Sequence, residues 1–277
     1  MEKKIITINH DTDIISALNE IGISYSYACK LLRNKDVRVN GQKMKENISL
    51  SFDDELIVFV SETVESPDDI LKKSIKYEDE NIIIISKPIG IEIEGKNQLC
   101  EKLKAFAVHR LDRNTTGLIV LAKNKPVQSI LVEAIKNKLI TKKYYAEVIG
   151  KTDFKNFKHN AFLLKDNEKS TVKIFDKQVK GSVSISTIFN TIKSNPSSSI
   201  VECTLITGKT HQIRASLAYL SHPIIGDGKY GKNEDNKKFK EKWQKLHSFY
   251  LSFKNLPSPL EYLNGKVFID NPVWLKK

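Results

Sequence analysis

Cysteine and paired metal-ligand patterns are scarce in this sequence, which limits the classes of protein to consider. The three cysteines, Cys29, Cys100 and Cys203, lie far apart and outside any Cys-x-x-Cys spacing. This spacing argues against a disulfide framework and gives no zinc-binding pattern. The six histidines show no paired-ligand spacing either, so we expect no metal ion.

Long apolar runs are also absent. No segment approaches the ~20 apolar residues of a membrane-spanning helix, and the start, MEKKIITINHDTD, has too short an apolar run for a secretory signal. We therefore expect a cytoplasmic protein without membrane contact. The chain has 277 residues, 40% hydrophobic and 28% charged, which is typical of a soluble globular protein with one large domain or a small and a larger one.

Positive charge is abundant and unevenly placed. The net charge is +12, and residues 1–100 hold 13 Lys and Arg against 18 Asp and Glu, whereas residues 101–277 hold 32 against 15. The basic excess therefore lies in the C-terminal part, where it would attract a phosphate backbone. A lysine-rich surface that keeps the protein soluble explains the charge equally well.

Arginine is rare among these basic residues. Only 5 of the 45 are arginine, namely Arg33, Arg38, Arg110, Arg113 and Arg214. Since lysine serves where charge alone suffices, we interpret the arginines as planar groups that pair with carboxylate or phosphate. Arg110 and Arg113 flank Asp112 in VHRLDRNTTG, a polar turn that leads into the apolar run LIVLA. A loop that carries chemistry on a buried strand has this pattern; the alternative is a surface turn with weak ion pairs.

A second motif, TGKTHQIR at 207–214, follows a predicted strand at 201–206. Its Gly-Lys-Thr resembles the end of a Walker loop, but that loop needs glycine where the chain has Cys203, which excludes a nucleotide-binding P-loop. We expect a helix from this point to about residue 221. Its N-terminus and Lys209 then predict an anion site, and Arg214 would project from the same end.

The N-terminal part predicts two short helices and a hairpin. Asp11–Asp13 can cap a helix that ends at Gly22, and Ser24 can cap a second over 25–34. An alternating strand over 37–42 runs into an Asn-Gly turn, and a buried strand follows at 56–60. This order, in ISYSYACKLLRNKDVRVNGQKMKENISLSFDDELIVFV, resembles the S-four-like RNA-binding module. The resemblance implies RNA contacts from Lys30, Arg33, Lys35 and Arg38.

The remaining elements are predicted from apolar patterns. We expect a linker at 62–76, a turn at 77–81, a strand at 82–85 and a helix that begins at Pro126. An alternating strand over 142–150 would point one of its two tyrosines inward. A lysine-rich helix at 237–245 and a last strand at 247–253 follow.

Four motifs in this order resemble the RluA-type pseudouridine synthases: HRLDRNTTGLIVLAKN, KKYYAEVIG, LITGKTHQIR and HPIIGDGKYG. The resemblance covers about residues 77–255. It implies an α+β fold with a mixed, largely antiparallel sheet core, flanking helices and a cleft for RNA. The domains would be the S-four-like module at 1–61, the linker at 62–76 and the catalytic domain at 77–277. The implied reaction isomerises uridine in RNA to pseudouridine without metal or organic cofactor.

The resemblance also implies roles for single residues. Asp112 would be the catalytic aspartate, Tyr144 would lie against the target base, and Arg214 would pair with Asp112. Arg110 would help displace the base from its stack, and His109, Arg113 and Lys209 would contact RNA, with Lys209 standing where the family usually has arginine. A carboxylate suits this chemistry, because it is ionised at neutral pH and needs no base to activate it.

The substrate is expected to be large-subunit rRNA, with tRNA as the alternative, and the protein is expected to act as a monomer. The main rival interpretation is a non-catalytic RNA-binding protein, in which the basic surface alone carries the function and Asp112 has no catalytic role. A protein-kinase interpretation of HRLDRN fails, because the chain has neither a GxGxxG loop nor an Asp-Phe-Gly.

Overall fold

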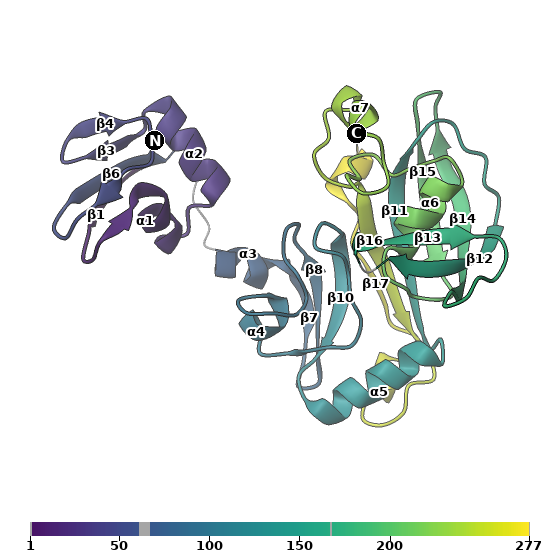
Figure 1. The fold of residues 1–277 in the computed structure, drawn as a ribbon. Helices are drawn as coiled ribbons and strands as arrows, with labels where there is room; N and C mark the ends of the chain where they lie inside the picture. The colour runs from purple at the N-terminus through teal and green to yellow at the C-terminus, as the bar shows by residue number, and fades with distance from the viewer. Residues whose placement is uncertain (1, 61–66, 167, 277) are drawn as a thin grey trace. The chain divides into compact units, whose positions relative to one another are not determined.

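The computed structural model describes residues 2–60, 67–166 and 168–276, and the chain divides into two compact units, Met1–Lys73 and Ser74–Lys277 (Figure 1). Residues 61–66, in the predicted linker, lie outside the described residues. The rest of that linker has regular structure, with helix α3 at Pro67–Ser74 and strand β7 at Ile75–Glu78. The predicted turn at 77–81 was therefore too long. Ile75 and Tyr77 alternate inward along β7, a pattern too short to recognise in the sequence.

The N-terminal unit packs two helices against a small antiparallel sheet. Helix α1, Ile14–Glu20, and helix α2, Tyr25–Asn34, follow their predicted caps, since Asp13 and Ser24 accept hydrogen bonds from backbone N–H groups of the first turn. The sheet order is β1-β6-β3-β4. The strands are β1 (Glu2–Thr7), β6 (Glu55–Val60), β3 (Val37–Val39) and β4 (Gln42–Met44), while β2 (Thr12–Asp13) pairs with β5 (Ser49–Leu50).

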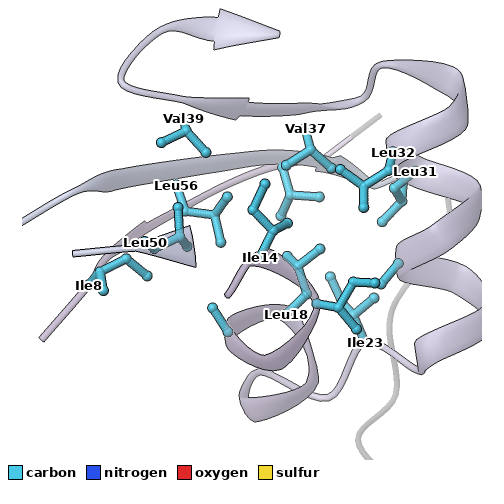
Figure 2. Packing of buried hydrophobic residues seen from close by; sticks show 14 of the residues in the cluster. Ile8, Ile14, Leu18, Ile23, Leu31, Leu32, Val37, Val39, Leu50 and Leu56 are labelled. Carbon is cyan, nitrogen blue, oxygen red and sulfur yellow. The ribbon is translucent and has the colours of Figure 1, made fainter. Parts of the chain in front are cut away.

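The core of this unit lies between the helices and the sheet. Ile14 and Leu18 of α1, Leu31 of α2 and Leu56 of β6 all point into it (Figure 2). Each is at most 2% exposed. Burial of these side chains at the helical and strand spacings explains why so short a segment forms a unit of its own.

The larger unit is built on one 11-stranded sheet. Its main path is β13-β12-β14-β15-β11-β16-β10-β8-β7, with β9 on β10 and β17 on β16. The strands not yet bounded are β8 (Ile82–Lys87), β9 (Phe106–Ala107), β10 (Thr116–Ala122), β11 (Ile140–Ile149), β12 (Phe157–Asp166), β13 (Thr171–Phe175), β14 (Val183–Ser194), β15 (Ser198–Leu205), β16 (Leu246–Phe253) and β17 (Val267–Ile269). Among the described strands, β10 and β16 run parallel and all other pairs are antiparallel. The predicted mixed, largely antiparallel α+β core is confirmed.

The parallel pair depends on a close approach of two backbones. Gly117 on β10 lies opposite Ser248 on β16. Its φ is +99°, and a Cβ there would stand 2.3 Å from the Ser248 carbonyl oxygen. Only glycine tolerates both constraints. The contact fixes the start of β10, and hence the Asp112 turn just before it, against β16.

Helices flank the sheet as predicted. Helix α5, Lys125–Lys136, buries Leu131 against the sheet, and helix α6, Gln212–Tyr219, packs on β13 through Ala215. The short helices α4 (Leu99–Lys102), α7 (Asn233–Lys238), η1 (Glu261–Leu263) and η2 (Val273–Lys276) complete the unit. No helix among the described residues is long and apolar enough to span a membrane.

Two predictions near the C-terminus were wrong. The lysine-rich helix predicted at 237–245 is α7, which begins earlier and ends at Lys238. Lys240 adopts a left-handed φ of 55°, which a continuing α-helix does not allow. The strand predicted as the last, now β16, is followed by β17, which pairs with it.

Candidate active site

The Asp112 turn is held by contacts on both sides. Thr115 donates its backbone N–H to the Asp112 carbonyl at 2.9 Å, which closes the turn. The Thr115 side chain is buried and its Oγ1 accepts a 2.7 Å hydrogen bond from the Gln244 side chain. The Asp112 backbone is therefore fixed, while its carboxylate keeps about 25% of its side-chain surface exposed.

Lys87, at the end of β8, connects this turn to the loop that follows β8, residues 88–91. Its side chain is 1% exposed, and its Nζ donates to the carbonyls of Pro88, Ile91 and Arg113, each at 2.9 Å. Burial lowers the pKa of Lys87 to about 7, opposed by the charge of Asp112. No sequence pattern predicts a role for this residue, because its partners are backbone atoms on two separate loops.

Arg214 lies between two carboxylates. Its Nη1 donates to Asp112 Oδ2 at 2.7 Å, and its Nε and Nη2 donate to the two oxygens of Asp227 at 2.7 and 2.8 Å. Arg214 is 6% exposed and Asp227 is fully buried. The two-pronged pair orients the guanidinium so that its remaining face meets Asp112.

Asp227 belongs to this site although no role was predicted for it from the sequence. Burial opposes its ionisation, yet the Arg214 guanidinium holds the pKa of Asp227 below its usual range. The backbone N–H groups of Lys229 and Tyr230 donate to the same carboxylate. Its one signal in the sequence was its place between two glycines in the loop HPIIGDGKYG.

Tyr144 is the inward-pointing tyrosine of β11. It is 4% exposed, whereas Tyr145 points to the other face and stacks on Phe249 with ring centroids 3.8 Å apart. The pairing of β11 with β16 shifts by one residue between Lys143 and Tyr144, a bulge that re-aims the side chains beyond it. Burial raises the pKa of Tyr144, and the Asp112 charge adds to this, so the phenol stays protonated at neutral pH.

One cavity of about 450 Å³ collects most of the predicted residues. Its lining includes Asp112, Tyr144 and Arg214, together with His109, Arg110 and Lys209. A neighbouring cavity of about 540 Å³ is lined by Arg113 and shares Arg110, Asp112 and Arg214 with the first. The six residues come from three segments of the sequence, and the fold brings them together.

The four basic residues predicted in the N-terminal unit do not belong to this cavity. Lys30, Arg33 and Lys35 are exposed on α2 and its C-terminal end. Arg38 is partly buried, and its guanidinium lies 5.2 Å from the centroid of the Phe59 ring.

Comparison with known proteins identifies the family. Residues 81–219 match the model of a family described as RNA pseudouridylate synthase. The chain belongs to this family. It is an RNA pseudouridine synthase, an isomerase, as the four motifs implied.

Several known pseudouridine synthases are similar over most of the chain. A protein of Mycoplasma capricolum subsp. capricolum described as an uncharacterized RNA pseudouridine synthase is 31% identical, over 90% of this chain and 89% of that protein. Ribosomal large subunit pseudouridine synthase C of Vibrio cholerae is 31% identical, over 76% of this chain and 73% of that protein. The solved human RNA Pseudouridylate Synthase Domain Containing 4 shares the fold, with a TM-score of 0.61 and 21% identity over 76% of this chain and 92% of that one.

The cavity of about 450 Å³ also holds a buried lysine for which the sequence predicted no role. Lys142 lies two residues before Tyr144 on the same face of β11 and is 8% exposed. Its Nζ stands beside Gly208, where a Cβ would be 3.7 Å away. Burial lowers the pKa of Lys142 to about 8. Burial and the nearby Lys142 charge together lower the pKa of His109, so that ring is neutral at physiological pH.

Proposed function

We propose that this synthase isomerises uridines in large-subunit ribosomal RNA through Asp112. The observation that carries the proposal is the 2.7 Å hydrogen bond from Arg214 to a carboxylate that is held on a fixed turn and still partly exposed to a cavity. A buried, fully paired aspartate would be structural. A freely exposed one would lack a fixed direction.

The reaction breaks the bond between N1 of uracil and C1′ of the ribose and forms a bond between C5 and C1′, with loss of the C5 proton and gain of a proton at N1. The Asp112 carboxylate bonds transiently to the ribose or the base while the uracil turns. Arg214 orients the carboxylate and stabilises its charge, and the fixed position of both groups reduces the entropy lost on reaching the reactive geometry.

Tyr144 contacts the base from the wall of the cavity. Because its phenol stays protonated, it acts through its ring and its O–H rather than as a phenolate. The target uridine must leave its stack at a cost of a few kcal/mol, and a ring beside it returns ~1–3 kcal/mol by stacking. The exposed Arg110 occupies the space from which the base is displaced.

The choice of ribosomal RNA rests on relatives and charge. The relative from Vibrio cholerae is named for the ribosomal large subunit, and residues 101–277 hold 32 basic against 15 acidic residues. In this proposal Arg113, Lys209 and His109 contact the RNA near the site, and Lys30, Arg33, Lys35 and Arg38 contact it from the N-terminal unit. The monomeric state and cytoplasmic location stay predictions.

The test maps pseudouridine in ribosomal and transfer RNA after incubation with the purified protein. The wild type is expected to modify large-subunit rRNA. Asp112→Asn is expected to give no product, while RNA affinity stays within about a few-fold because the carboxylate neutralises no phosphate. Asp153→Asn, at an exposed position outside both cavities, is the matched control. Product on tRNA alone would refute the rRNA assignment, and an active Asp112→Asn would refute the role of Asp112.

A further inference from the structure

An exposed tryptophan borders the site without any role in the chemistry described above. The Trp243 side chain is 44% exposed and lines the 540 Å³ cavity that shares Arg110, Asp112 and Arg214 with the catalytic one. Tryptophan is a large, mainly apolar side chain, and the chain has only two. A ring left in water at the mouth of a substrate cavity is a candidate contact for an apolar or aromatic surface of that substrate.

The backbone at Trp243 is held firmly although its ring is exposed. Gly226, with φ +81°, passes so close that a Cβ there would stand 2.0 Å from the Trp243 carbonyl oxygen. Beyond it, Lys245 donates its N–H to the Ile225 carbonyl at 2.9 Å, and the buried Gln244 side chain bonds to Thr115. The backbone that carries the ring is thus held between the loop that carries Asp227 and the turn that carries Asp112. Little backbone freedom remains to be lost there when a ligand binds.

The charges around the ring suit a strand of nucleotides. The Lys242 Nζ lies 5.0 Å from the centroid of the Trp243 ring, and Lys229 lines the same cavity. Arg110 and Arg113 line it from the Asp112 turn, together with the carboxylates of Glu92 and Glu94. A lining of several cations, the three acids Asp112, Glu92 and Glu94, and one tryptophan ring fits a base with a phosphate on either side better than it fits a free anion.

We propose that Trp243 stacks on the base of a nucleotide adjacent to the target uridine, while Lys242 moves to that nucleotide's phosphate. This inference rests on the proposed function, because it assumes that the uridine enters beside Asp112. It assigns a binding site for a neighbouring base of single-stranded RNA to a residue that touches no reacting atom. Stacking of one base on an aromatic ring predicts a loss of RNA affinity of roughly 5- to 100-fold when the ring is removed.

The first measurement uses Trp243 as its own reporter. The substitution Trp274→Phe leaves Trp243 as the sole tryptophan. This protein is titrated with a nine-nucleotide RNA that has one central uridine among cytidines, and with two versions in which the nucleotide 5′ or 3′ of the uridine is abasic. We expect the intact RNA to quench Trp243 fluorescence and one of the abasic versions to lose most of this quenching. Equal quenching by all three RNAs, or none by any, would overturn the inference.

The second measurement separates stacking from folding. Trp243→Phe keeps a ring and is expected to retain affinity for the intact RNA within about threefold, whereas Trp243→Ala is expected to lose roughly 5- to 100-fold. With the RNA modified in the mapping experiment, Trp243→Ala should raise KM and leave kcat within about twofold. A fall in kcat with unchanged KM would contradict the inference. If Asp112→Asn is inactive but RNA does not change Trp243 fluorescence, the proposed function stands and this inference fails. If Asp112→Asn is active but RNA quenches Trp243 fluorescence, the proposed role of Asp112 fails and the stacking site stands.

Discussion

Both carboxylate oxygens of Asp227 accept hydrogen bonds from Arg214, from its Nε at 2.7 Å and from its Nη2 at 2.8 Å. These bonds use the side of the guanidinium that faces away from Asp112. This pair decides the direction of the 2.7 Å hydrogen bond from Arg214 to Asp112. Asp112, which we propose as the catalytic acid, is therefore positioned through Arg214 by a second acid, Asp227, which is fully buried.

The first prediction concerns the contact between Asp227 and Arg214. Asp227→Asn keeps the shape of the side chain but weakens its grip on Arg214, so the guanidinium and Asp112 are less well placed. We expect kcat to fall by roughly 100-fold, the effect of misplacing a reacting group by about 1 Å. RNA affinity should stay within a few-fold. Single-turnover kinetics and a filter-binding assay measure the two quantities. The exposed Asp153→Asn is the control, and an unchanged kcat in Asp227→Asn would refute the positioning role.

The second prediction concerns Lys142 and pH. Because burial lowers the pKa of Lys142 to about 8, the amine is charged at neutral pH and loses its charge as the pH rises through about 8. If that charge attracts the RNA into the cavity, kcat/KM should fall above pH 8 by up to about tenfold per pH unit. Lys142→Arg keeps its charge at any pH studied.

The kcat/KM of the wild type and of Lys142→Arg is compared from pH 6.5 to 9.5. This comparison shows whether Lys142 sets the pH dependence, because titration of the RNA itself affects both proteins equally. Lys142→Arg should lack the alkaline fall that the wild type shows. Lys142→Met, with no charge, should have a low kcat/KM at every pH. Identical profiles for wild type and Lys142→Arg would show that Lys142 does not set the pH dependence.

The third prediction concerns Lys87. Lys87→Met removes the donor to the carbonyls of Pro88, Ile91 and Arg113. Within the described residues, only the Arg113 carbonyl also accepts a hydrogen bond from the backbone N–H of Gly90, so we expect a loss of unfolding free energy of about 1–3 kcal/mol. Both tryptophans, Trp243 and Trp274, lie in the larger unit, so tryptophan fluorescence in urea follows that unit. Lys96→Met, at an exposed lysine, is the control.

The pH dependence of this loss has a definite sign. The pKa of Lys87 is about 7 in the folded protein and ~10.4 in an unfolded chain. Between these values the unfolded chain binds more protons, so the wild type should gain stability relative to Lys87→Met as the pH rises from about 7 to about 10. A stability difference that shrinks over this range would contradict the assignment.

The fourth prediction concerns Gly117. Gly117→Ala places a Cβ within 2.3 Å of the Ser248 carbonyl and strains a φ of +99°, so β10 and β16 must separate. Gly265→Ala is the matched control, since its φ of +79° is also positive but nothing lies within 4 Å of a Cβ there. We expect the control to lose ~1 kcal/mol from backbone strain and Gly117→Ala to lose more, with a lower kcat. Equal losses in the urea midpoint would show that the close approach is unimportant.

Local interactions explain why several elements were predictable. Helix α2 has the predicted bounds, 25–34, because its cap residue Ser24 and its buried face act within one or two turns. The alternation of β11 likewise predicted that one of its two tyrosines points inward, and the structure shows that it is Tyr144. The helix predicted at 237–245 was wrong because lysines are compatible with many conformations, and no apolar spacing fixed its position.

The sequence by itself indicated the family, because the order and residue types of four local motifs resemble it, and this resemblance named the candidates Asp112, Tyr144 and Arg214. Only the tertiary structure decided that Asp227 faces Arg214, that Lys87 joins two loops, and that Lys142 and Trp243 line the cavities. Asp112 and Arg214 themselves stand 102 residues apart in the chain. Contacts of this kind depend on how the sheet brings distant loops to one place, and that placement results from burial over the whole unit rather than from any single segment.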